Sequence, residues 1–169
     1  MILADIWQDF RQPEYIHVLL NPLPVYGLAT GCLGLFIALL LRSRRGQIAT
    51  LVVVLLTAAS AWPVKEYGEQ AYDRVLSMTD ADGEAWLKVH EHRADEWIYI
   101  FYALAALALV AIVAPLKWPR AASALAMITL LVGLLALGAG CYIAYAGGKV
   151  RHREFRNAPP PTLSETERP

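Results

Sequence analysis

The sequence contains few cysteines, no excess of charge of either sign and no motif of a catalytic site. Its two cysteines, Cys32 and Cys141, lie inside apolar runs and form no CxxC pair. This excludes a disulfide framework and favours small core residues. The 15 basic and 15 acidic side chains cancel, so nucleic-acid binding has no electrostatic support. No Ser-His-Asp arrangement or phosphate-binding glycine loop is present, so we expect a redox subunit at most, not an enzyme with its own catalytic site.

Charge is also absent from four long apolar runs. They cover residues 25–41, 48–64, 97–116 and 121–147. A helix needs roughly 20 apolar residues to cross a bilayer core, and 57% of the chain is hydrophobic, more than in a soluble domain. The pattern predicts an all-α fold, a four-transmembrane-helix bundle. The start "MILADIWQDF" has no basic residue, so we expect no cleavable signal peptide.

The two short connections between the apolar runs carry only positive charge. "RSRRGQ" and "KWPR" contain five Lys and Arg residues and no acid, and all 15 acids lie in the other segments. Lys and Arg in short loops mark the cytoplasmic face of a membrane protein. We therefore expect a multi-pass protein of the bacterial inner membrane, with both termini and residues 65–96 on the extracytoplasmic side.

Three segments are expected along the chain. Residues 1–20 carry an apolar helical face, which indicates an interfacial or packing helix, and residues 21–150 contain the four-span bundle. That face consists of Ile2, Leu3, Ile6, Trp7 and Phe10. Residues 151–169 are polar and proline-rich, which predicts a disordered tail. In the long loop, "EYGEQAYDRVL" predicts one helix, and a second should start at Thr79 or Asp82 and run into the third span.

Small residues recur along the first and fourth spans. They are Gly27, Gly31 and Gly34 in the first, and Ala136, Gly140, Ala144 and Gly148 in the fourth. Such stripes favour close helix packing in lipid, and they would also leave room for a flat cofactor. If the fourth helix runs on through Gly148, the same spacing reaches His152; we expect instead that the glycines end it. Asn21 is expected to cap the first span and Pro22 to start it.

All four histidines fall in segments expected on the extracytoplasmic side. They are His17, His90, His92 and His152. On a helix, the face of His90 also holds Trp86, Ala94, Trp97 and Phe101. His92, two positions further on, points the opposite way and is expected to meet water. His17 in "YIHVLL" and His90 are therefore the two imidazoles with apolar surroundings.

These two histidines allow three interpretations. A half-buried imidazole often does no more than find a hydrogen-bond partner. Alternatively, His17 and His90 hold a b-type haem between facing helices, with Arg93 paired with a propionate and His152 in reserve. The third interpretation is a zinc or copper ion bound by His17, His90 and a carboxylate such as Glu14, although no metal-motif spacing supports it.

Three motifs carry a resemblance to a known family. They are "HVLLNPLPVYGLATG" with His17, Pro24, Gly27 and Gly31, "HEHRADEW" with His90, and "YIAYAGGKV" with Tyr145, Gly147 and Gly148. Over residues 15–150 the chain resembles a bacterial membrane protein family, domain of unknown function two-two-three-one. The resemblance implies a four-span bundle that begins with a histidine- and proline-containing motif. Relatives joined to c-type cytochrome domains imply a redox membrane.

The sequence thus leaves several functions open. The first is a b-type haem-binding or electron-transfer subunit whose site lies at the extracytoplasmic face. The second is a non-catalytic accessory subunit that packs against a larger membrane complex through its small-residue faces. A metal-binding or sensing protein is a weaker third. The expected partners are the lipid bilayer, other membrane subunits and a c-type cytochrome.

Overall fold

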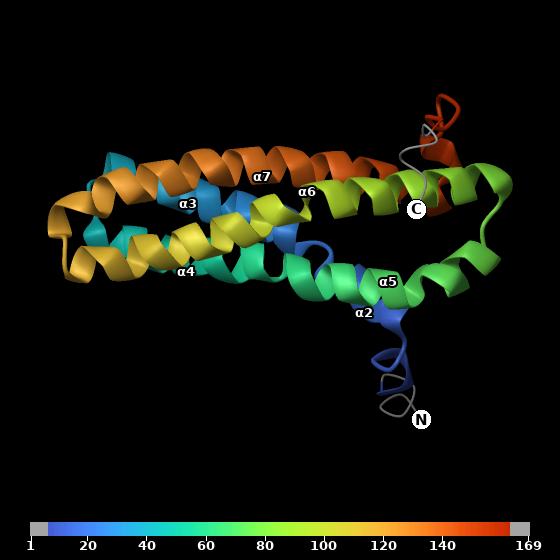
Figure 1. Ribbon diagram of the computed structural model, residues 1–169, viewed down its shortest axis with the longest axis horizontal. Coiled ribbons are helices and arrows are strands. Elements are labelled where there is room, and N and C mark those ends of the chain that lie inside the picture. Colours follow the sequence, from blue (N-terminus) through green and yellow to red (C-terminus); the bar gives the residue numbers. More distant parts are fainter. Residues whose placement is uncertain (1–6, 163–169) are drawn as a thin grey trace.

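The computed structural model describes residues 7–162, which form helices and turns without any strand. Four long apolar helices run side by side along an elongated bundle (Figure 1). The predicted all-α bundle of four long helices is therefore confirmed. Ile2, Leu3 and Ile6, three of the residues expected on the N-terminal apolar face, lie outside the described part of the chain.

Each long helix is assembled from one or more segments. The first consists of α2 (Pro13–Leu20), a π-helical turn (Leu23–Gly27) and α3 (Leu28–Leu40); the second of α4 (Arg44–Ala59) and α5 (Ala61–Ser77); the third of α6 (Ala81–Val113); and the fourth of α7 (Ala122–Arg151). Short 3-10 turns at Ala114–Leu116 and Pro119–Ala121 join α6 to α7, and another at Arg153–Phe155 follows α7. The single helix predicted to run through His90 into the third span is α6, 33 residues long.

The lipid-facing part of the bundle is apolar on both its inner and outer surfaces. On α7, for example, Ala136 is fully buried, whereas Leu131 and Leu135 are 56% and 66% exposed. A helix that is hydrophobic all round is typical of a membrane span. With four such helices long enough to cross a bilayer, the fold is that of a multi-pass membrane protein.

Glycines let the first long helix pack closely against α4. A Cβ atom at Gly27 would lie 2.7 Å from the Thr57 side chain, and one at Gly31 would lie 2.9 Å from the Val54 side chain. Gly34 meets α4 in the same way. The stripe in the first span is therefore a helix-packing surface, as small residues in membrane bundles usually are, and it leaves no slot for a cofactor.

Exposed aromatic side chains lie near both ends of the apolar zone. Trp118 marks one end, and at the other end are Tyr26, Trp62, Trp97 and Tyr99. Aromatic rings prefer the boundary between lipid and water. Most of α5 and the first half of α6 extend beyond the second boundary, together with α2 and the last turns of α7. Trp97 is 40% exposed, so its predicted place on an inward face with His90 is wrong.

Several local expectations also fail. Asn21 ends α2 and makes no side-chain cap, and a wider π-turn follows because Pro22 and Pro24 remove amide donors there. The residue that caps α6 is Asp80, whose carboxylate accepts from the Gly83 amide at 2.8 Å, rather than Thr79 or Asp82.

Two further expectations concern α7. The helix runs through Gly147 and Gly148 and ends at Arg151, so the glycine pair does not stop it. Cys141 on this helix is exposed, whereas Cys32 on α3 is buried. Only Cys32 is therefore the small core residue that we expected.

Candidate functional site

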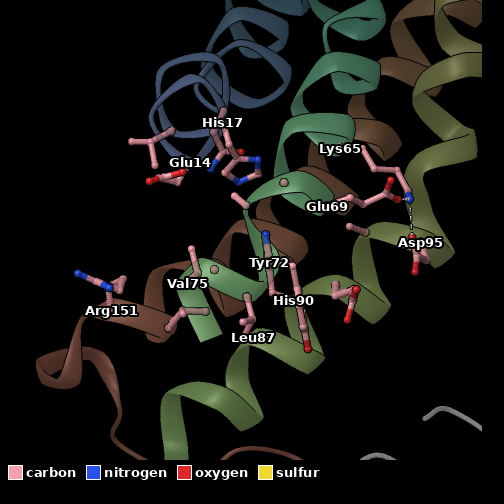
Figure 2. A pocket seen from close by; sticks show the side chains of 18 residues that line it. Glu14, His17, Lys65, Glu69, Tyr72, Val75, Leu87, His90, Asp95 and Arg151 are labelled. Atoms are coloured by element: carbon pink, nitrogen blue, oxygen red, sulfur yellow. Dashed lines mark hydrogen bonds and ion pairs between the residues drawn. The ribbon is translucent and has the colours of Figure 1, made fainter. Parts of the chain in front are cut away.

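The structure brings His17 and His90 together. His17 projects from α2 and His90 from α6, and the centres of the two rings are 6.3 Å apart with their planes at 85°. Both side chains enter a pocket at the end of the bundle that extends beyond the aromatic boundary (Figure 2). Two imidazoles separated by 73 positions in the sequence therefore share one site.

Two cavities meet at the histidine pair. The larger has a volume of about 210 Å³ and is lined by residues from α2, α5, α6 and α7, half of them polar or charged. The smaller, about 60 Å³, lies deeper in the bundle and reaches Phe101. Both cavities are lined by His17, Asn21, Lys65, His90 and Ala94. The two imidazoles thus stand between an outer and an inner space.

Each imidazole is fixed by one hydrogen bond to a backbone carbonyl. His17 Nδ1 lies 2.8 Å from the Val64 oxygen, and His90 Nδ1 lies 3.0 Å from the Ile143 oxygen. A carbonyl oxygen can only accept, so each Nδ1 carries the hydrogen and donates it. In the neutral ring the lone pair is then on Nε2, and no hydrogen bond to either Nε2 is found among residues 7–162. Both rings can therefore act as ligands or acceptors.

A glycine lies beside each of these carbonyls. A Cβ atom at Gly68 would be 2.9 Å from His17 Nδ1, and one at Gly147 would be 2.9 Å from His90 Cε1. Each glycine follows its carbonyl by four residues, which places it next to that oxygen on the helix. Gly68 was not among the residues predicted from the sequence, although an isolated glycine inside a helical pattern often has a packing reason.

The rim of the larger cavity is charged. Lys65 forms ion pairs with Glu69 and with Asp95, the latter at 2.8 Å. Glu14 pairs with Arg74 at 2.8 Å, so this candidate metal ligand already has a cationic partner. Arg151 lines the cavity opposite Lys65 (Figure 2), and the described residues supply it with no ion pair.

The other predicted site residues lie elsewhere. Arg93 donates to the Tyr142 oxygen at 3.0 Å and stacks 3.7 Å over the Tyr142 ring, so it faces α7 and lines neither cavity. His152 contacts the Glu154 carboxylate and stacks on Phe155 outside the pocket. His92 lines neither cavity. Of the predicted residues, His17, His90 and the carboxylate of Glu14 line the larger cavity, whereas Arg93 and His152 do not.

The described residues do not form a site with several protein ligands for a bare metal ion. Within residues 7–162, no group of three His, Cys, Asp or Glu side chains is placed to hold one. Zinc sites usually take three or four protein ligands. The donor set of this pocket is instead a pair of neutral imidazoles.

These features define the class of protein. It is a multi-pass, all-α membrane bundle whose helices extend past the lipid-facing zone and enclose a pocket with two imidazoles. Comparison with protein-family models, curated proteins and solved structures finds no match. What the pocket binds is therefore inferred from the chemistry of its own residues.

Proposed function

We propose that this chain is a membrane subunit that binds b-type haem and serves electron transfer, with His17 and His90 as the two axial ligands. The observation that carries the proposal is the pair of Nε2 lone pairs on rings that face one pocket from different helices. Histidine is a common axial ligand of haem iron, and bundles build such sites from facing helices.

The separation of the rings suits two imidazoles that would hold one metal ion between them. Imidazole nitrogens bind metals at about 2 Å, so a pair on opposite sides of a metal has ring centres about 6 Å apart, and a tetrahedral pair about 5 Å. The observed separation is 6.3 Å. The distance is therefore one at which both imidazoles would be able to hold the same metal ion.

The surrounding residues also fit this group. Cavities adjoin the histidine pair on two sides, and the deeper one is lined mostly by apolar residues, which would suit a flat macrocycle. Arg93 is engaged with Tyr142, so we assign the propionate-pairing role to Arg151 on the cavity rim. Haem, when bound, supplies a one-electron carrier. The chain holds the rings: each Nδ1–H bond to a carbonyl fixes the tautomer and makes Nε2 a stronger donor to a metal.

We further propose that the pocket faces the extracytoplasmic side of the bacterial inner membrane. The arginine-rich turn around Ser43 lies at the opposite end of the bundle, where positive loops face the cytoplasm. A c-type cytochrome or another membrane subunit would then meet the pocket end. A Ser43→Cys variant should resist a membrane-impermeant thiol reagent applied from outside, with Thr79→Cys as the reactive counterpart; the reverse pattern would invert the topology.

The absorption spectrum of the purified protein, supplied with haem, tests the proposed function. We expect a Soret band typical of two axial imidazoles, and its loss or shift in both His17→Ala and His90→Ala. His152→Ala is the matched control, because that ring points away from the pocket. A folded wild-type protein that takes up no haem would contradict the proposal.

A further inference from the structure

We infer that the chain consists of two equivalent helical hairpins, and that Gly68 and Gly147 are equivalent positioning residues that present the two imidazoles to a single ligand from opposite sides. The first hairpin comprises α2 to α5, and the second comprises α6 and α7. The identity of the ligand rests on the proposed function. The equivalence of the hairpins stands on the geometry alone.

The contacts of the histidines show the repeat. Adding 73 to the number of His17 gives His90. On the second helix of each hairpin, equivalent positions are 79 residues apart, so Val64 corresponds to Ile143 and Gly68 corresponds to Gly147. Both the carbonyl that accepts from Nδ1 and the glycine that contacts the ring therefore recur at equivalent positions.

The smaller cavity is lined almost entirely by equivalent residues. With the histidines, the pairs are Asn21 and Ala94, Val25 and Ile98, Ala61 and Gly140, Val64 and Ile143, and Lys65 and Ala144. Only Pro24 and Phe101 lack an equivalent in this lining. Each hairpin thus contributes the same positions to the wall.

The larger cavity follows the same rule. In addition to the histidine, asparagine–alanine and glycine pairs, its lining contains Glu14 and Leu87, Val18 and Glu91, Ala71 and Val150, and Tyr72 and Arg151. The residues without an equivalent are Lys65, Glu69, Val75 and Asp95. The repeat therefore preserves positions but not chemistry at the rim.

Buried positions in the apolar zone agree as well. Equivalent buried pairs are Leu28 and Phe101, Leu35 and Ala108, Ala38 and Ala111, and Leu51 and Leu130. Packing is also equivalent: α3 contacts α4 and α7, and α6 contacts α7 and α4. Both hairpins begin at the pocket end, so a twofold axis that relates them runs along the bundle, as in parallel repeats of membrane proteins.

This arrangement explains the need for both glycines. A methyl group at either position would lie too close to ring atoms, and would move the imidazole away from its carbonyl. Without the carbonyl, the ring would be free to carry its hydrogen on Nε2 and lose its metal-binding lone pair. A ligand on the axis meets the same donor from both sides, which suits a planar metal macrocycle with two similar faces.

The tautomers of the two rings can be measured in the ligand-free full chain by ¹⁵N NMR of labelled histidine. Wild-type protein should show hydrogen on Nδ1 of both rings. Gly68→Ala should change only the signal of His17, and Gly147→Ala only that of His90. Gly148→Ala is the control, because its Cβ would meet only Phe155 at 3.8 Å. Unchanged signals in both variants, or hydrogen on Nε2 in wild type, would overturn the positioning role.

A double-mutant cycle keeps the inference testable if the alanine variants are unstable. Gly68→Ala should lower the thermal midpoint in the wild-type background and have little effect on the His17→Ala background, where the ring is absent. Gly147→Ala and His90→Ala should behave in the same way. Equal losses on both backgrounds would mean that the glycines serve helix packing alone and would refute the inference.

Haem titration separates this inference from the proposed function. Each glycine variant should weaken haem binding by about 10- to 100-fold, as loss of an outer-shell partner does, and by similar factors for the two. If wild type binds no haem while the NMR and cycle results hold, the proposed function fails and the two-sided site stands. If haem binds and only one glycine affects it, the equivalence of the hairpins fails.

Discussion

The two hairpins position equivalent histidines on very different helices. His90 lies within α6, a continuous helix of 33 residues that starts at a capped end and is tied to α7 through Arg93. His17 lies on α2, which has eight residues, none of them buried, and is followed by a proline-containing π-turn. Similar hydrogen-bond geometry is therefore reached on a long continuous helix and on a short interrupted one, and we expect the short one to be the adjustable half. In the proposed function, such asymmetry would help a ligand to enter the pocket, because segments with few buried contacts open most easily.

The largest effect is expected when α6 receives a proline at the position that is equivalent to Pro22 in the first hairpin. Asp95 is the equivalent of Pro22, so Asp95→Pro would place a proline inside α6 and destabilise the protein by about 3 kcal/mol or more. Thermal unfolding in detergent measures this change. Asp95→Ala is the control: it removes the partly exposed ion pair with Lys65, which is worth on the order of 1 kcal/mol or less. Equal effects of the two variants would show that α6 tolerates the break.

Amide hydrogen exchange tests which half is adjustable. Amides of α2 should exchange at least about tenfold faster than those of residues 84–95 in α6, which corresponds to about 1.4 kcal/mol. The reason is that α2 has no buried residue, whereas this part of α6 buries Trp86, Leu87, Val89 and Arg93. Equal protection of the two segments would contradict the proposed difference between the hairpins.

The second hairpin is also held together at the start of α6 and the end of α7 by a clasp centred on Arg156. Arg156 donates to both carboxylate oxygens of Asp80, at 2.7 and 2.9 Å, and to the carbonyls of Lys149 and Val150. Arg156→Ala should therefore speed exchange at the start of α6 and the end of α7, with exposed Arg151→Ala as the control. No change in exchange would mean that the clasp does not hold these ends together.

Acid should release the same clasp. Hydrogen bonds from the Gly83 amide and the Arg156 side chain hold the pKa of the Asp80 carboxyl below its usual value. Because this pKa is lower in the folded than in the unfolded state, ionised Asp80 stabilises the folded protein at pH values above the unfolded-state pKa of about 4. This stabilisation is lost as the pH falls through the folded-state pKa. Exchange near residue 80 should rise in that acidic range in wild type, and Asp80→Asn should remove the dependence.

The smallest effect is expected at two exposed positions of the apolar zone that are equivalent in the two hairpins. Gly138 is the equivalent of Ala59, and a Cβ at Gly138 would meet nothing within 4 Å. Gly138→Ala should stabilise α7 by less than about 1 kcal/mol, because alanine is the better helix former. A measurable loss of stability would show that α7 makes an outer contact at this position.

Local patterns in the sequence predicted a good part of this structure. The charge-free runs located the four long helices, and helical spacing separated His90 from His92. The same reasoning misplaced Trp97 and Arg93, because the direction of a side chain depends on how its helix is rotated against its neighbours. It also missed Gly68, whose role depends on a histidine 51 positions earlier on another helix. The repeat was hidden because it preserves burial and backbone contacts but very few residue types.

The sequence by itself determined that the chain forms long apolar helices, because in lipid each helix must satisfy its own backbone hydrogen bonds regardless of its neighbours. The tertiary structure alone decided that His17 and His90 face each other. Their meeting depends on the rotation of α2 against α5 and of α6 against α7, and small residues set that rotation by allowing the backbones to come close. The paired imidazoles are therefore a product of helix packing rather than of any local motif.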